Sequence, residues 1–182
     1  MQIPPRPGVA DARGGICIDQ ASLAGVMELY VVRHANAGRR STWDGDDDER
    51  PLSKKGRKQA AAIGERLATT GVDRLVSSPT LRCVQTLEPL AKRLGTAIDV
   101  DQRLLEGATG DDALELAAEL AGTCTGAVVC SHGDVIPELL RTLYAGTTRI
   151  ADPLVWPKGS IWAVTWDGES WSTARYLPPP EI

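Results

Sequence analysis

The chain of 182 residues is long enough for one substantial hydrophobic core, and we expect a single folded domain. Its net charge is −4 and its basic residues are dispersed, unlike the basic stripe of a nucleic-acid-binding protein. No apolar run approaches the roughly 18 residues that a membrane-spanning helix needs, and the N-terminus lacks a secretory signal pattern. The composition therefore favours a cytoplasmic protein whose partner is a small molecule rather than nucleic acid or a membrane.

Metal chemistry has two candidate sources in the sequence. The chain has four cysteines and two histidines, and the cysteines form no CxxC pair. A Cys/His zinc site is hard to build from this set, so we expect reduced thiols, no metal and no other cofactor. The acidic run "DGDDDE", residues 44–49, is the second source, but like charges in a loop more often mark a solvated turn. A local ion pair between Asp47 and Arg50 would hold such a turn.

Residues 1–26 carry Pro and Gly without a sustained period, which predicts a flexible N-terminal extension. The folded domain is expected to cover residues 27–182. Met27 is also a candidate native translation start, a hypothesis that the intact mass of the natively expressed protein tests.

Beyond Met27, short apolar runs alternate with helical patterns. The runs 28–33, 72–78, 97–100 and 126–131 are typical of strands, the third of them weak. Helices are predicted over 54–70, capped by Ser53 and stopped at Gly71, over 80–95, over 111–122 and over 134–146. Gly95 would end the second helix, and Pro89 should bend or split it.

The C-terminal part changes character. The runs "SIWAVTW" and "SWSTARYL" flank "DGE", which predicts a hairpin. Strands alternating with helices indicate an α/β fold. We therefore expect a three-layer α/β/α arrangement with a mostly parallel central sheet and a late antiparallel hairpin.

Three polar clusters follow predicted parallel strands: "RHANAG", "SSPTLR" and "SHGD". The carboxyl ends of such strands meet at one edge of the sheet, where ligands of open α/β folds bind. Both histidines of the chain, His34 and His132, therefore share this edge, and each precedes a small residue, Ala35 or Gly133. A single histidine here would be read as structural, but two of two indicate a site.

The residue types indicate phosphate chemistry. Arg33 and Arg82 offer planar forks of donors that match phosphoryl oxygens. A neutral imidazole can attack phosphorus and form a covalent phosphohistidine, while a second, protonated imidazole would supply positive charge. Glu106, in the loop after the weak strand, is the candidate proton donor for the leaving group, because enclosure beside phosphate would favour its protonated form.

In this order, "RHA", "SSPTLR", "LLEG" and "SHG" resemble the motifs of the histidine phosphatase superfamily, also called phosphoglycerate mutase-like. The resemblance covers about residues 27–176 and implies that fold. It implies that His34 is the nucleophile and that Arg33, Arg82, His132 and Gly133 form the phosphate pocket. It also implies that Glu106 is first the acid for the leaving group and then the base for water, and that Ser53, in "RPLSKKGRKQA", lies near the substrate.

The chain departs from the family in ways that bear on its activity. The interval between Glu106 and His132 is short, whereas mutases of the family build a covering insertion there. An open pocket admits water, which implies a phosphatase that acts on a phosphomonoester or a related small molecule. The layout is similar to the compact bacterial phosphohistidine phosphatases and to the phosphatase-like half of Nudix-fused nucleotide hydrolases. Some compact members lack a well-placed carboxylate, so the acid role of Glu106 is what the wider family implies.

Several alternatives stay open. A nucleotide or polyphosphate hydrolase would use basic residues near the predicted edge for further phosphates, and the candidates are Arg39, Arg40 and Lys158. A protein phosphohistidine would be the substrate of a second variant. A binding module that holds phosphate without cleaving it, and a metal-dependent hydrolase that uses the acidic loop, are the alternatives from other classes. Trp43 in that loop is a candidate substrate contact, while Cys83 is interpreted as core.

Overall fold

The computed structural model describes residues 25–182. The expected N-terminal extension over residues 1–26 lies outside the described residues except for its last two. The helices and strands are β1 (Met27–Arg33), α1 (Lys54–Leu67), β2 (Arg74–Ser77), α2 (Leu81–Leu94), β3 (Ile98–Val100), α3 (Gly110–Ala121), β4 (Gly126–Ser131), α4 (Val135–Ala145), β5 (Arg149–Ile150), β6 (Ile161–Trp166) and β7 (Trp171–Leu177). Short 3-10 turns lie at Arg40–Thr42, Asp47–Glu49 and Gln102–Leu104.

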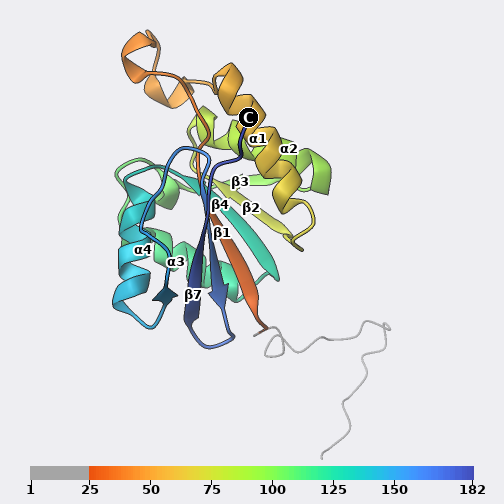
Figure 1. Cartoon of the computed structure of the whole chain (residues 1–182), viewed down its shortest axis with the longest axis vertical. Helices are drawn as coiled ribbons and strands as arrows, with labels where there is room; N and C mark the ends of the chain where they lie inside the picture. Colours follow the sequence, from red (N-terminus) through yellow and green to blue (C-terminus); the bar gives the residue numbers. More distant parts are fainter. Residues whose placement is uncertain (1–24) are drawn as a thin grey trace, which may run out of the picture.

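The strands form one mixed sheet in the order β3-β2-β4-β1-β6-β7-β5 (Figure 1). The strands β3, β2, β4 and β1 are parallel neighbours, β6 and β7 run antiparallel beside β1, and β5 pairs in parallel with β7. The predicted mostly parallel sheet with a late antiparallel hairpin is therefore confirmed. The two-residue strand β5 is not foreseen, because a run this short carries no alternation to detect.

Alternate residues of the central strands face opposite layers of helices. On one face, Leu29 and Val31 of β1 join a core with α3 and α4, and on the other Tyr30 and Val32 join a core with α1 and α2. This period of two follows from the pleat of a strand, and burial of both faces explains why β1 and β4 are almost wholly apolar. The three-layer arrangement is confirmed, and β1 lies at its centre.

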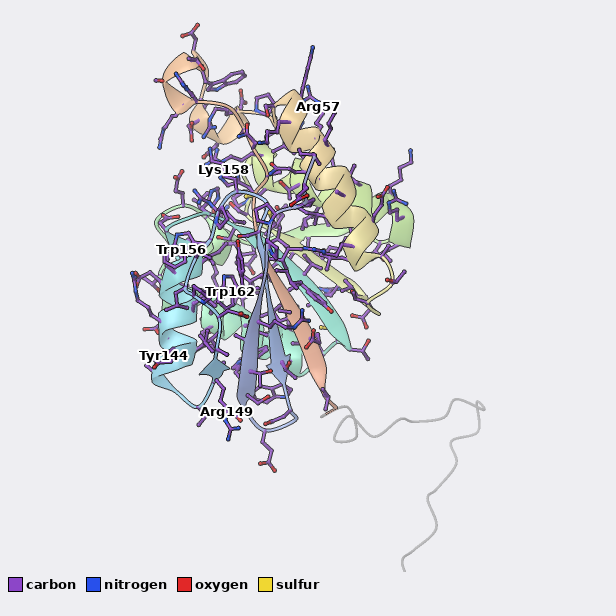
Figure 2. The ribbon with its side chains drawn as sticks, viewed as in Figure 1. Arg57, Tyr144, Arg149, Trp156, Lys158 and Trp162 are labelled. Atoms are coloured by element: carbon purple, nitrogen blue, oxygen red, sulfur yellow. The ribbon has the colours of Figure 1, made fainter. Side chains whose placement is uncertain are left out.

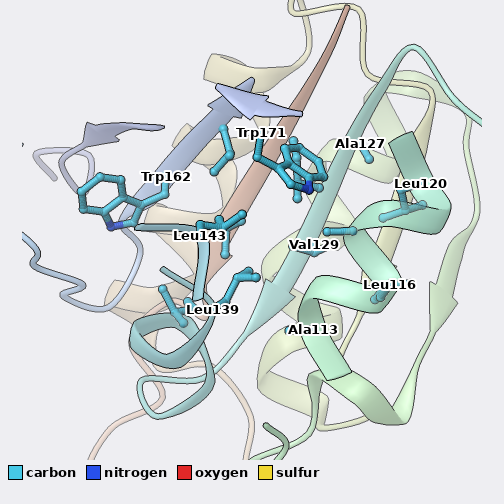
Figure 3. Close-up of a cluster of buried hydrophobic side chains, with 14 of the residues drawn as sticks. Ala113, Leu116, Leu120, Ala127, Val129, Leu139, Leu143, Trp162 and Trp171 are labelled. Carbon is cyan, nitrogen blue, oxygen red and sulfur yellow. The ribbon is translucent and has the colours of Figure 1, made fainter. Parts of the chain in front are cut away.

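Figure 3 shows the first of these two cores. Leu116 and Leu120 of α3 pack against Ala127 and Val129 of β4, and Trp162 of β6 lies in the same cluster. Burial of side chains of this size stabilises the fold by about 1.5–3 kcal/mol each. The core therefore fixes β4, whose carboxyl end carries part of the polar edge described below.

The helix starts and the end of α2 follow the predicted signals, whereas α1 ends at Leu67, three residues before its predicted end. The Ser53 hydroxyl accepts the Gly56 N–H at the start of α1, and Gly95 ends α2 with a φ of +66°. A capping box of Thr109 and Asp112 opens α3, which begins at Gly110, one residue before the predicted start. None of the helices in the described part of the chain is long and apolar enough to cross a membrane.

Of the two predicted effects of Pro89, a bend or a split of the second helix, the split is wrong, because α2 runs unbroken through the proline. Pro89 removes one backbone donor, yet α2 is held by packing on both sides of the proline. Leu87 and Leu90 are fully buried, and α1 approaches so closely at Gly64 that a Cβ there would lie 3.2 Å from the Pro89 Cβ. Tertiary packing thus outweighs the local cost of the proline.

A second close approach joins α1 to the segment after β1. A Cβ on Gly56 would lie 1.9 Å from the Asn36 carbonyl oxygen, so only glycine fits there. The Ser53 N–H donates to the same carbonyl at 2.9 Å, and the Ser53 hydroxyl donates to Asn36 Oδ1 at 2.8 Å. The first turn of α1 therefore holds the backbone that follows His34.

Candidate active site

The polar edge predicted from the sequence lies where β1 and β4 end. His34 follows the last residue of β1, and His132 follows the last residue of β4. Because the two strands are adjacent and parallel, with Arg33 paired to Ser131, the imidazole ring centroids lie 5.5 Å apart. Arg82 lies in the first turn of α2, which follows β2, and its side chain reaches His132.

The ring of His34 is buried and its proton is placed by one hydrogen bond. Nδ1 lies 2.8 Å from the carbonyl oxygen of Ala35, and a carbonyl can only accept, so Nδ1 carries the hydrogen and Nε2 carries the lone pair. Burial, and then the charges of Arg82 and Arg33, lower the pKa of His34 to about 3. His34 is thus a neutral imidazole with a free nitrogen, which is the form that a nucleophile requires.

His132 is oriented from both sides. Its Nε2 lies 2.8 Å from the Ser78 hydroxyl and 3.4 Å from that of Thr80, and its Nδ1 lies 3.4 Å from Arg82 Nη2. Since a guanidinium can only donate, Nδ1 accepts and Nε2 donates to Ser78. A proton on Nδ1 would be needed before His132 could donate to an anion.

Arg33 lies flat on Gly133. A Cβ on Gly133 would come within 2.5 Å of Arg33 Nη2, so the glycine makes room for the guanidinium. Arg33 Nη1 donates to the Trp156 carbonyl at 2.7 Å, while its buried Nε has no hydrogen-bond partner among the described residues. Partial burial lowers the pKa of Arg33, and a partly buried cation with an unsatisfied buried donor favours an anionic ligand.

Arg82 is the most enclosed charge of the site, with a side chain only 1% exposed. Its Nη1 donates to the Asp47 carbonyl at 2.6 Å and lies 3.2 Å from Asp47 Oδ2, and its Nη2 donates to Glu106 Oε2 at 3.0 Å. The buried Nε has no hydrogen-bond partner among the described residues. Two carboxylates from separate loops therefore hold the fork of this arginine.

Asp47 is a site residue that the sequence analysis did not identify. Its predicted pair with Arg50 is confirmed at 2.8 Å, but the contact with Arg82 depends on how the loop between β1 and α1 folds back over α2. No spacing in the sequence reveals such a contact. Figure 1 shows this loop projecting beyond the end of the sheet at which β1 stops.

Glu106 lies at the mouth of the site, and its side chain is 44% exposed. Glu106 lines a groove of about 510 Å³. The other residues that line this groove are Arg40, Asp48, Leu105, Gly107 and Asp134. The Gly107 N–H donates to Asp134 Oδ2 at 2.7 Å, which ties the Glu106 loop to the residues after His132. A group of metabolite size fits this groove.

The basic residues near the edge differ in their surroundings. Lys158 is half-buried, burial and the charges of Arg33, Arg50 and Arg82 lower its pKa, and the next residue, Gly159, donates its N–H to the carbonyls of Arg33 and His34. Figure 2 shows it at the end of the molecule opposite Arg149. Arg40 is 69% exposed and lies 3.4 Å from Asp47, while Arg39 is exposed.

Three other residues singled out in the sequence have clear structural surroundings. The Ser53 hydroxyl is occupied by the cap of α1 and by Asn36, so the structure gives it a structural role. Cys83 is buried in the core, as interpreted, but its Sγ also lies 3.6 Å from His132 Nε2. The Trp43 indole donates to the Asp46 carbonyl and keeps its ring partly exposed.

The lowered pKa of His34 makes the stability of the fold pH-dependent. The unfolded state takes up a proton near pH 6.5 and the folded state only near pH 3, so stability is lost as the pH falls between these values. We expect the free energy of unfolding to fall by on the order of 2 kcal/mol from pH 7 to pH 4.5 through this group. Denaturant unfolding of wild type and His34→Asn measures it; equal pH dependence of the two proteins would contradict the assignment.

The contact between Gly133 and Arg33 predicts a variant that loses binding but not stability. In Gly133→Ala the methyl group displaces a flexible guanidinium, so the affinity for inorganic phosphate should fall at least tenfold. The free energy of unfolding should change by no more than about 1 kcal/mol. Calorimetry and thermal unfolding test both, with Gly122→Ala as control, because a Cβ on Gly122 meets nothing closer than 3.7 Å. Unchanged phosphate affinity in Gly133→Ala would count against the contact.

Comparison with known proteins identifies the family to which this chain is similar. The model of the histidine phosphatase superfamily (branch 1) matches residues 29–122. A protein of Mycolicibacterium smegmatis named 8-oxo-(d)GTP phosphatase is 38% identical over 156 residues, 84% of this chain and 48% of that protein. One of Citrobacter koseri named probable phosphoglycerate mutase GpmB is 39% identical over 85 residues, 44% of this chain and 38% of that protein. The chain spans half or less of the length of these relatives.

Solved structures agree on the fold. The protein histidine phosphatase SixA, complexed with tungstate, superimposes with a TM-score of 0.66 at 22% identity, covering 84% of this chain and 95% of that one. A mycobacterial glucosyl-3-phosphoglycerate phosphatase gives a TM-score of 0.64 at 20% identity, covering 83% and 97%. At such identities the likeness shows the shared phosphoglycerate mutase-like fold alone. With the match over residues 29–122, the chain belongs to the histidine phosphatase superfamily.

Proposed function

We propose that this protein hydrolyses a phosphorylated small molecule, a phosphomonoester or a related compound, through a covalent phosphohistidine on His34 and without a metal ion. The observation that carries the proposal is the state of His34: a buried, neutral ring whose Nε2 is free and which stands beside two arginines. A neutral imidazole is the nucleophilic form, and the arginines are the groups that bind the phosphoryl oxygens.

In the first step the lone pair on His34 Nε2 attacks phosphorus. A P–N bond forms as the P–O bond to the leaving group breaks, and the leaving oxygen takes the electron pair and a proton from Glu106. The hydrogen on Nδ1 stays with the Ala35 carbonyl throughout, so the ring needs no change of tautomer. In the second step water attacks phosphorus, Glu106 accepts its proton, and the P–N bond breaks to return neutral His34 and phosphate.

The arginines supply fixed positive charge in both steps. Arg33 and Arg82 approach from different strands, and charge spread over the equatorial oxygens of the transferring group is stabilised by donors that are already in place. In the unliganded site Glu106 accepts from Arg82 Nη2, where a phosphoryl oxygen would bind instead. Release from Arg82 leaves Glu106 beside the leaving group, in the groove that it lines.

A nucleotide phosphate is the second candidate substrate. The relative from Mycolicibacterium smegmatis is named 8-oxo-(d)GTP phosphatase, although this chain matches only 48% of its length. The groove beside Glu106 has room for a nucleoside as well as for a sugar, and Arg40 and Lys158 could meet a further phosphate. A phosphohistidine protein remains a third possibility, and a non-catalytic phosphate-binding module is the alternative of another class, although a binder needs no nucleophile.

Phosphate release from a panel of sugar phosphates, nucleotides, phosphoglycerates and a phosphohistidine protein tests the proposal, with chelator present throughout. We expect turnover by wild type, none by His34→Ala, and an acid-labile phosphoenzyme in rapidly quenched wild-type reactions. The ranking of the panel selects the substrate class. Turnover that survives in His34→Ala, or that the chelator abolishes, would refute the mechanism; phosphate binding without turnover would indicate the binding module.

The role of Glu106 is tested by varying the leaving group. Glu106→Gln keeps the shape but donates no acid proton, so kcat/KM should fall about a hundredfold for an alkyl phosphate. For p-nitrophenyl phosphate, whose leaving group departs unassisted, the loss in the first step should be under about tenfold. Glu88→Gln, on the exposed side of α2, is the control and should match wild type. Equal losses on both substrates would contradict the acid role.

A further inference from the structure

Asp47 stands at the junction of three arginines. Its carboxylate lies 2.8 Å from Arg50, 3.2 Å from Arg82 and 3.4 Å from Arg40, and its backbone carbonyl accepts from Arg82 at 2.6 Å. The side chain is only 16% exposed, so it is the more enclosed of the two carboxylates that touch Arg82. Carboxylate–guanidinium contacts of this kind fix direction as well as adding energy.

The position of Asp47 is itself fixed from the nucleophile side. Arg50 is buried, pairs with Asp47, and donates through Nη1 to the carbonyl of Ala37 at 2.9 Å. Ala37 lies three residues after His34 on the same buried segment. A continuous chain of charge-assisted contacts therefore runs from the backbone near His34 through Arg50 and Asp47 to Arg82.

The contacts of Arg82 leave one edge of the guanidinium for a ligand. Nη1 is taken by the carbonyl and carboxylate of Asp47, while Nε is buried with no partner among the described residues and Nη2 is shared with Glu106 and His132. Nε and Nη2 point the same way and grip an oxyanion bidentately. Glu106 must leave Arg82 in order to serve the leaving group, so of the two carboxylates Asp47 is the one that can hold the arginine through the whole reaction.

We infer that Asp47 is a positioning residue: it holds Nη1 of Arg82 so that the Nε–Nη2 edge faces the phosphoryl group. The inference rests on the proposed function for its kinetic consequence, but its effect on anion binding stands apart from turnover. Asp47 touches no reacting atom, and its whole effect is exerted through Arg82. The energetic signature of such a relation is coupling between the two side chains.

A double-mutant cycle tests this coupling. In the wild-type background, Asp47→Asn should lower kcat about tenfold with little change in KM, and should weaken binding of inorganic phosphate or tungstate several-fold. In the Arg82→Ala background, which itself loses at least a hundredfold in kcat, the same change should cost less than twofold on both measures. Asp47→Glu should recover part of the loss, because it restores the charge that holds Nη1.

Controls separate positioning from folding and from the proposed function. Asp44→Asn, an exposed carboxylate on the same loop, should match wild type in turnover and binding. Arg50→Gln loosens Asp47 without touching Arg82 and should reproduce the loss of kcat more weakly, while unfolding temperatures show that each variant is folded. Equal costs of Asp47→Asn in both backgrounds would overturn the inference. If wild type turns over no substrate, the proposed function fails alone, and the phosphate-binding cycle still decides the role of Asp47.

Discussion

The hydrogen bond from His34 Nδ1 to its neighbouring carbonyl is the constraint on which the site depends. It fixes which nitrogen is free, and it exists only because the backbone after β1 is held on every side. The His34 N–H donates to Ser131 on β4, the Gly159 N–H donates to the carbonyls of Arg33 and His34, and the Ala35 N–H donates to Thr86 on α2. The neutral state and single tautomer of His34 thus depend on strand order, since β1 lies between β4 and β6.

The His34 ring has two arginine side chains beside it, and each of them needs both space and a contact that holds it. Burial keeps the His34 ring deprotonated, and the charges of buried Arg82 and partly buried Arg33 add to this effect and attract an anion, yet each arginine must itself be held. Gly133 provides a flat support for Arg33 by lacking a side chain, whereas Arg82 is held by the carbonyl and carboxylate of Asp47. One arginine is therefore positioned by shape and the other by charge, which explains why a glycine and an aspartate from distant loops both matter to one pocket.

What the sequence predicts well is whatever repeats along the chain. Alternating burial identifies the central strands, and the strand–helix order places His34 and His132 at one edge before any geometry is known. The sequence does not predict that α2 continues through Pro89 or that β5 forms, because packing on Gly64 and pairing with β7 are non-local contacts. The contact between Asp47 and Arg82 is not predicted for the same reason. Within the acidic run the neighbouring carboxylates look equivalent, and only the fold of the loop brings this one to Arg82.

The contrast between regular elements and irregular loops also separates the groups proposed for the chemistry from those that would choose the substrate. The groups proposed to bind phosphate come from strand ends and a helix start, whose placement follows from the topology, while the groove beside Glu106 is built by irregular loops. The interval between Glu106 and His132 is taken up by α3 and β4, both packed into the core, so no chain remains there to cover the groove. In the proposed reaction, a site left open in this way would admit water to the phosphohistidine. Under that proposal openness favours hydrolysis over transfer to a second bound substrate, and the residues around the rim of the groove that would choose the substrate are Arg40, Asp48 and Asp134.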